Sequence, residues 1–433
     1  MYRFVFIVLF VLYACKSGIA QSDTVPDYFD NNFLRYTNHI YRENIKTPEL
    51  FREGAELTYP VIELNSSDKL KLCFDDLDSG TRNYWYRLIH CDAGWQPSDL
   101  NYSDYMDGFE YNKIYDYKFS FNTFCKYTHY FVSVPNEDVR PKISGNYIIE
   151  VFEDYNPDNI VLTRRFSVVE YKLGIDAEVK RATLIDLKKS HQEIDFNVRK
   201  DASITDPYGE IKVVLVQNNR WDNAVSGLKP SLIKDQTLIY DFDEDNNFPG
   251  GSEYRHFNTN NVRFQSEHIK SIIYEDPYYH YYLENDNRRP YKIYSYHEDI
   301  NGKFMVDVEQ GDDKDIEADY VYVTFNLSYD APVVNGNIYV SGAFTGWNFG
   351  NENRMKYKFE EKAYQLTLFL KQGYYNYEYV FVKDGSTKGD NTIIEGSHYE
   401  TENDYFIYIY FHDINIRYDK LIGFKVVNSL KKL

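Results

Sequence analysis

The sequence contains few cysteines and no cysteine–histidine pattern. Its 433 residues include four cysteines, and Cys73, Cys91 and Cys125 are the three that lie beyond the N-terminal leader. Three cysteines allow at most one internal disulfide, and the sequence leaves open which pair would form it, if any. No Cys-x-x-Cys or Cys/His cluster stands at zinc-ligand spacing. We therefore expect domains held together by apolar cores, without a structural metal.

Long apolar runs are also missing, except at the start of the chain. The run Phe4 to Ala14 follows Arg3 and is only about eleven residues long, too short for a helix that crosses a bilayer. The small residues of Gly18-Ile19-Ala20 then indicate a signal peptide cleaved after Ala20. Leu12-Tyr13-Ala14-Cys15 resembles a lipoprotein box with Cys15 as the acylated residue, but Tyr13 stands where a small residue is expected. We favour cleavage after Ala20 and an exported, soluble mature chain, with lipidation at Cys15 as the lesser alternative.

Catalytic signatures are absent from the sequence. There is no Gly-x-Ser-x-Gly elbow, His-Glu-x-x-His helix, phosphate-binding glycine loop or dinucleotide fingerprint, and the segment that begins His297-Glu298 lacks the second histidine of a zinc site. The carboxylates of Asp241, Asp243 and Asp245 are spaced as in a calcium loop. However, Asn246 replaces the glycine of the sixth position and Ser252 the glutamate of the twelfth, so an ordinary polar turn is the favoured interpretation. We predict a protein that is not an enzyme, with no catalytic, cofactor-binding or metal-binding residues and no cofactor.

Acidic and aromatic residues are abundant instead. The chain has 67 acidic against 48 basic side chains, a net charge of −19, which disfavours nucleic acid and anionic lipid as partners. It also has 44 Tyr and 29 Phe but only 4 Met, a composition typical of β-strands. A tyrosine-rich carbohydrate-binding surface is one interpretation. Tyrosines on ordinary sandwich strands are the favoured one.

Short strand patterns separated by turn signals divide the chain into three blocks. They are residues 21–171, 172–315 and 316–433, and the acidic stretch 309–315 reads as a connection between the last two. Strands such as 83–90, 147–152, 211–217 and 374–382 alternate or run apolar, and no segment of the first block sustains a helical period. The sequence therefore predicts an all-β chain of three consecutive immunoglobulin-like or early-set β-sandwich domains.

The C-terminal block resembles early-set domains related to glycogen-binding modules. The resemblance rests on VSGAFTGWNFG from Val340 and YQLTLFLKQGYYNYEYVFVKDG from Tyr364, with Trp347 at the position of the first ligand-stacking tryptophan. Glu378 stands where such modules carry a lysine, and no tryptophan follows Asp384-Gly385. A periplasmic or surface glycan-binding protein that uses the Trp347 face is therefore the alternative function, and we expect Trp347 to serve packing.

A more extensive resemblance runs through all three blocks. The chain is similar to the plug-protein family of the bacterial type IX secretion system in six strings that occur in order: YWYRLIHCDAGWQPSDL from Tyr84, DGFEYN from Asp107, HQEIDFNV from His191, QNNRWDNA from Gln217, NFPGGSEYRHF from Asn247 and RYDKLIG from Arg417. The resemblance implies a periplasmic, non-catalytic protein that closes the periplasmic end of the outer-membrane translocon barrel. It implies that barrel as the partner, membrane association only through it, and no small-molecule substrate or nucleic acid.

Most residues within these strings have a structural interpretation. We predict that Trp85, Trp95 and Trp221 anchor cores or turns, since large aromatics dominate burial in sandwiches. Pro249-Gly250-Gly251 is expected to hold a tight turn. The charged pairs Arg220 with Asp222 and Arg417 with Asp419 are expected to brace loops, so none of these residues is predicted to contact a partner.

Overall fold

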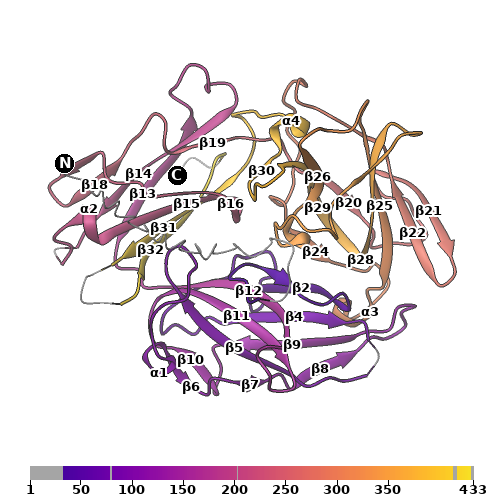
Figure 1. Cartoon of the computed structure of the whole chain (residues 1–433), viewed down its shortest axis with the longest axis horizontal. Helices are drawn as coiled ribbons and strands as arrows, with labels where there is room; N and C mark the ends of the chain where they lie inside the picture. The colour runs from indigo at the N-terminus through magenta and orange to yellow at the C-terminus, as the bar shows by residue number, and fades with distance from the viewer. Residues whose placement is uncertain (1–32, 79, 202, 413–416, 431–433) are drawn as a thin grey trace, which may run out of the picture.

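The structure is a computed structural model that describes residues 33–78, 80–201, 203–412 and 417–430. The predicted signal segment, Cys15 and the cleavage site after Ala20 lie outside these residues. In the described residues strands dominate, and each α-helix is a single turn: α1 (Tyr102–Tyr105), α2 (Pro207–Glu210), α3 (Lys314–Glu317) and α4 (Thr392–Glu395). No helix within these ranges has the length and apolar character needed to span a membrane. The predicted all-β sandwich fold is confirmed (Figure 1).

The first unit, sandwich 1, contains the strands from β1 to β12. One sheet has the order β1 (His39–Ile40), β12 (Ile160–Val169), β11 (Gly145–Glu153), β5 (Tyr84–Cys91), β7 (Asn112–Lys113), with β3 (Val61–Glu63) parallel to β12. The facing sheet has the order β2 (Ile45–Arg52), β4 (Leu70–Asp76), β9 (Thr128–Val134), β8 (Asp116–Phe119). A short ribbon pairs β6 (Met106–Gly108) with β10 (Val139–Pro141). Aromatic rings fill the core between the sheets, where Phe74, Tyr84 and Tyr130 contact one another.

The second unit, sandwich 2, is built from two separate parts of the chain. Its first sheet has the order β13 (Gly174–Arg181), β14 (His191–Arg199), β18 (Thr237–Tyr240), β17 (Leu232–Lys234), and β19 (Asn247–Pro249) also pairs with β14. Its second sheet has the order β16 (Arg220–Ser226), β15 (Ile211–Gln217), β31 (Asp404–Phe411), β32 (Lys420–Asn428). The last two strands of the chain therefore return to this unit.

The third unit, sandwich 3, lies between β19 and β31 in sequence. One sheet is centred on β29 (Gly373–Lys383), which pairs with β20 (Arg255–Asn258), β24 (Phe304–Val306), β26 (Gly336–Ser341) and β30 (Gly389–Asp390). The other has the order β21 (Ile269–Glu275), β22 (Tyr278–Leu283), β25 (Tyr320–Ser328), β28 (Ala363–Lys371), β27 (Lys356–Lys358), with β23 (Asp286–Asn287) parallel to β25. The 3-10 turn η1 (Ala343–Thr345) follows β26.

The sheets divide the chain differently from the expected blocks 172–315 and 316–433. β31 pairs with β15 in the register Ile211 with Phe411 to Gln217 with Tyr405, so sandwich 3 is an insertion into sandwich 2. The physical reason lies in the core of sandwich 2, where Ile407 and Ile409 pack with residues such as Val213 and Leu215. β31, near the C-terminal end of the chain, pairs with β15 and supplies the apolar side chains that complete this core.

The acidic stretch 309–315 lies inside sandwich 3 and does not connect two domains. Its last three residues, at the start of α3, form ion pairs with sandwich 1: Asp313 with Lys118 at 2.7 Å, Asp315 with Lys71 at 3.2 Å, and Lys314 with Glu56 at 2.5 Å. A segment without apolar residues is thus held in place by charge.

Candidate functional site

The junction between sandwiches 1 and 2 holds a partly buried arginine between two tryptophans. The Arg165 guanidinium lies 4.3 Å from the Trp95 ring centroid and 5.4 Å from that of Trp221. Burial lowers the pKa of Arg165 to about 9, and its Nε donates to the carbonyl of Tyr36 at 2.7 Å. Trp95 and Trp221 thus pack at an interdomain contact as well as in a turn.

Asp419 adds a polar contact to the same junction. It accepts hydrogen bonds from the Ala93 backbone at 2.9 Å and from Lys212 Nζ at 2.9 Å, joining the turn after β5 to β15 and β32. Burial opposes ionisation of this carboxyl, but Lys212 holds its pKa below the ordinary value. Arg417, its expected partner, is exposed, and no ion pair in the described chain joins the two.

Sandwiches 1 and 3 meet at a buried charge network. Asp75 on β4 accepts from Lys371 Nζ at 2.7 Å and from the Tyr320 hydroxyl at 2.7 Å, and shares a 2.7 Å hydrogen bond with His129 Nδ1. The side chains of Asp75 and Lys371 are 1% and 2% exposed. Burial alone would raise the pKa of Asp75, but Lys371 and His129 hold it below its ordinary value. An ion pair this deep fixes how the two units sit against each other, because either charge left alone would be costly.

Sandwiches 2 and 3 are joined by a third buried network. Arg220 on β16 pairs with Asp222 at 2.9 Å and with Glu378 on β29 at 2.7 Å. Glu378, which replaces the lysine of glycogen-binding modules, therefore serves this junction. The Asn218 amide extends this junction, because it donates to the hydroxyl of Tyr254, which directly precedes β20, at 3.3 Å.

The segment Pro249-Gly250-Gly251 belongs to the same junction, where Pro249 ends β19 and the two glycines form an irregular connection in place of the expected tight turn. The Gly250 carbonyl accepts from Asn403 at 2.9 Å. A Cβ at Gly250 would lie 1.9 Å from the carbonyl oxygen of His398, and Gly251 has φ +67°, so both positions require glycine.

Trp347 lies where the three units meet, and its ring is enclosed. The residue is 8% exposed, its ring lies 6.0 Å from that of Tyr254, and the Arg220 guanidinium is 6.0 Å from its centroid. A Cβ at Gly302 would stand 2.3 Å from the Trp347 ring, which shows how closely the backbone approaches it. A sugar ring can stack only on an aromatic ring with an open face. Because the Trp347 ring is enclosed, it does not offer the stacking face that the glycan-binding alternative requires.

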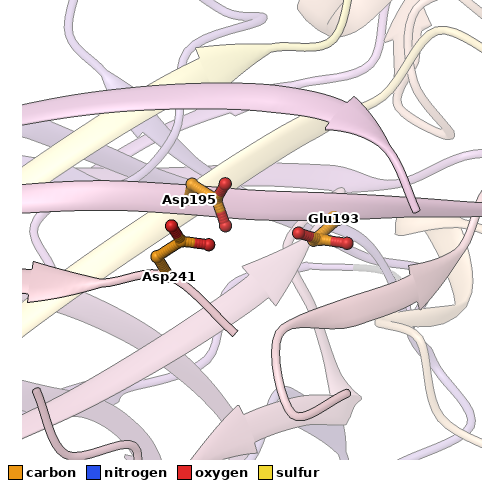
Figure 2. A group of neighbouring side chains, drawn as sticks. All are labelled: Glu193, Asp195 and Asp241. Carbon is orange, nitrogen blue, oxygen red and sulfur yellow. The ribbon is translucent and has the colours of Figure 1, made fainter. Parts of the chain in front are cut away.

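The described residues hold one group of carboxylates with metal-ligand spacing. Glu193 and Asp195 on β14 and Asp241 after β18 place ligand oxygens within 4.8 Å of one another, and Asp195 and Asp241 face each other (Figure 2). The Lys180 ammonium neutralises part of the negative charge of this group, because it pairs with Asp195 and with Glu193, the latter at 3.0 Å. Asp243 and Asp245, the other members of the expected calcium loop, are not in the group.

A surface feature that the sequence analysis did not identify lies on the edge strand β8. Five aromatic residues on or next to this strand, together with two residues on β21, are 45% to 71% exposed: Tyr115, Tyr117, Phe119, Phe121, Phe124, Ile273 and Tyr274. We call this set the aromatic surface. The Phe124 and Tyr274 rings lie 5.6 Å apart, so the surface crosses from sandwich 1 to sandwich 3. Both β8 and β21 are terminal strands of their sheets and lie on the same side of the molecule in Figure 1.

Exposed aromatics at two adjacent sheet edges indicate a protein contact. Large apolar side chains that stay in water and unpaired strand edges both favour association with another chain. The alternation of Tyr115, Tyr117, Phe119 and Phe121 identifies a strand, but a buried strand would show the same pattern. Only the sheet order reveals that β8 pairs with β9 alone and is the terminal strand of its sheet.

Comparisons with known proteins place this geometry in a family. A family model for the type 9 secretion system plug protein 1st domain matches residues 45–170, which span most of sandwich 1. A crystal structure of a hypothetical protein from Parabacteroides merdae is 37% identical, with a TM-score of 0.89 over 92% of this chain and 100% of that one. A comparison with curated proteins found no match. The chain belongs to the type 9 secretion system plug protein family.

Proposed function

We propose that this protein occludes the periplasmic end of the type IX secretion translocon barrel by binding to it. Membership in the plug family gives the chain a role in type IX secretion and suggests a location in the periplasm or at the outer membrane. In this proposal the protein is periplasmic and meets the membrane only through the translocon. It acts by shape, without catalysis.

The observation that carries the proposal is the locked arrangement of the three sandwiches in a chain of this family. Each pair of units is joined by a polar contact of a buried side chain: Asp419 with the Ala93 backbone, Asp75 with Lys371, and Arg220 with Glu378. Removing one partner of a buried ion pair typically costs about 3–5 kcal/mol, so the units resist rotation against one another. A body that must close a channel benefits from such rigidity, because a hinged plug would leak.

The aromatic surface is the proposed contact with the translocon. Protein interfaces are enriched in tyrosine and phenylalanine at their desolvated centre. The edges of β8 and β21 also leave backbone hydrogen-bonding groups for an added strand of the partner. With a net charge of −19, the protein should associate faster at low ionic strength if the barrel mouth is basic.

The proposal is tested by purifying the native translocon barrel from cells that carry variants of this protein. Phe119→Asp combined with Phe121→Asp places two charges on the aromatic surface at residues that are 56% and 64% exposed, so the fold should persist. Phe359→Asp is the matched control, because Phe359 is 76% exposed on sandwich 3 and lies outside the aromatic surface. We expect the wild type and the control to co-purify with the barrel, and the double variant to be lost.

The outcomes separate the function from the contact surface. If the double variant co-purifies like the wild type, the aromatic surface is not the contact, although the plug function stands. If the wild type never accompanies the barrel and a deletion strain keeps normal outer-membrane permeability to large solutes, the plug function itself is refuted.

A further inference from the structure

Two adjoining cavities lie between sandwich 1 and sandwich 3. The larger has a volume of about 580 Å³ and lies between the β1–β2 region and the β24, β28 and β29 strands. The smaller, of about 110 Å³, reaches toward Trp347. They share Asn38, Arg164 and Phe304 as wall residues. The larger volume is in the range of pockets that hold small organic molecules.

The charge of these walls is opposite to that of the protein. Six cationic and four carboxylate side chains line the two cavities, in a chain with 48 basic and 67 acidic residues. The cations are Arg35, Arg42, Lys46, Arg164, Arg165 and Lys303, and of these Arg42 is already neutralised by an ion pair with Glu153, which lies outside the cavity lining. One of the carboxyls, Glu49, has its pKa raised to about 8 by burial and by the nearby Glu56, so it is mostly uncharged at neutral pH. The cavities are therefore an electropositive region inside an acidic protein.

Arg164 is the central cation, because it lines both cavities and has no carboxylate partner. It is 8% exposed, and no carboxylate among the described residues lies within ion-pair distance of its guanidinium. The group donates to the carbonyls of Thr163 at 2.8 Å, Pro48 at 3.3 Å and His39 at 3.4 Å. A guanidinium carries five N–H donors, so these bonds leave donors for a ligand. Buried charges are normally paired, and this one is not.

Lys46 in the larger cavity and Lys303 in the smaller one are also cations without a carboxylate partner among the described residues. Neither makes an ion pair in the described part of the chain, and burial lowers the pKa of both, as it lowers that of Arg164 to about 10. Lys303 Nζ instead lies 3.9 Å from the centroid of the Tyr59 ring. An anion near Arg164 would relieve the cost of burying its charge and would also attract the partly buried Lys46 and Lys303.

One wall of the larger cavity is apolar and aromatic, while amide side chains such as Asn348, Asn351 and Asn353 line another part of it. Phe304 and Phe344 both contact Tyr375, with ring centroids 5.3 Å and 5.5 Å away, and Leu368 and Leu370 complete that wall. Cations on one side of the cavity and aromatic rings on the other suit a ligand with an anionic head group and an apolar body.

We propose that the two cavities bind a small amphipathic organic anion, whose head group accepts hydrogen bonds from Arg164 near Lys46 and whose apolar body packs on Phe304, Phe344 and Tyr375. This inference does not depend on the plug function. It concerns a ligand held between two units of the protein.

Isothermal titration calorimetry on the full mature chain tests the proposal with octanoate as the probe and 1-octanol as its uncharged match. We expect one octanoate site per chain and at least tenfold weaker binding of octanol, because hydrogen bonds to a charged group are worth about a factor of ten or more. Arg164→Gln should weaken octanoate binding at least tenfold and Lys46→Gln several-fold. Lys234→Gln, on exposed β17 in sandwich 2, should leave binding unchanged.

Three results would overturn the proposal. They are no octanoate binding up to about 10 mM, equal binding of octanol, or unchanged affinity in variants that keep the far-UV circular dichroism of the wild type. If Arg164→Gln does not fold, Lys46→Gln and the octanoate–octanol comparison decide the question, because Lys46 is only partly buried and lies at the cavity wall.

Discussion

Replacing Asp75 by Asn should loosen the contact between sandwich 1 and sandwich 3. The substitution keeps the size of the side chain but removes the charge that faces Lys371 Nζ at 2.7 Å. The lysine would then be buried with no carboxylate on that side, retaining the carbonyl of Asp315 at 2.6 Å as an acceptor. Tyr320 and His129 would also lose a charged acceptor for their 2.7 Å hydrogen bonds.

The expected loss of unfolding free energy follows from this geometry. Removing one partner of a buried ion pair typically costs about 3–5 kcal/mol. The double variant Asp75→Asn with Lys371→Met removes both charges and should lose about 1–3 kcal/mol less than the sum of the two single variants. Asp107→Asn is the exposed control. Asp107 lies 3.7 Å from Lys142, their side chains are 69% and 40% exposed, and surface pairs contribute at most about 1 kcal/mol.

The pH dependence gives an independent check with a defined sign. The pKa of Asp75 is below its ordinary value in the folded protein. Its charge therefore contributes stability that is present above the unfolded pKa of about 3.9 and is lost as the pH falls through the folded pKa. Urea unfolding followed by circular dichroism should show the gap between wild type and Asp75→Asn at neutral pH, narrowing below about pH 4. A gap under about 1 kcal/mol at neutral pH, or one independent of pH, would refute the reasoning.

Three further predictions concern other buried groups. Trp347→Ala should destabilise the protein by about 3–5 kcal/mol, because the ring loses its burial and leaves a cavity. Affinity gels that contain α-glucan should retard neither the wild type nor this variant. Normal thermal stability together with a loss of glycan binding would show the packing role to be wrong. Cys73, Cys91 and Cys125 are buried and free, so all three should react with a thiol reagent only in denaturant, and replacing them together by Ala should leave a folded protein by circular dichroism. Burial raises the pKa of Glu253 to about 7, so this group makes stability fall as pH rises from about 4.5 to 7, by at most about 3 kcal/mol; Glu253→Gln should flatten that fall in urea titrations, and an unchanged pH profile would contradict the assignment.

Local patterns in the sequence carry much of the fold. β5, β15 and β29 were predicted as strands because each has alternating or continuous apolar residues bounded by turn signals. The return of β31 to β15 could not be predicted in this way. Its apolar pattern suits any sheet edge, and its partner in the register lies about two hundred residues earlier in the chain.

The junctions were inaccessible to sequence reasoning for a similar reason. Asp75 and Lys371 are 296 positions apart, and in a chain with 67 acidic residues no pattern identifies one buried carboxylate. Trp347 was assigned to packing because its companion ligand residues are missing, whereas its place between three units required the structure. The exposure of Phe119 and Phe121 depends on the order of strands in a sheet, which local alternation does not reveal.

The most direct test of the central claim is the conductance of the isolated translocon barrel in a planar bilayer. We predict that the folded protein, added to the periplasmic side, closes the open channel, and that closure slows as salt rises. The Phe119→Asp, Phe121→Asp variant should leave the channel open, and the Phe359→Asp control should close it. A channel that stays open at saturating concentrations of the folded wild type would contradict the account.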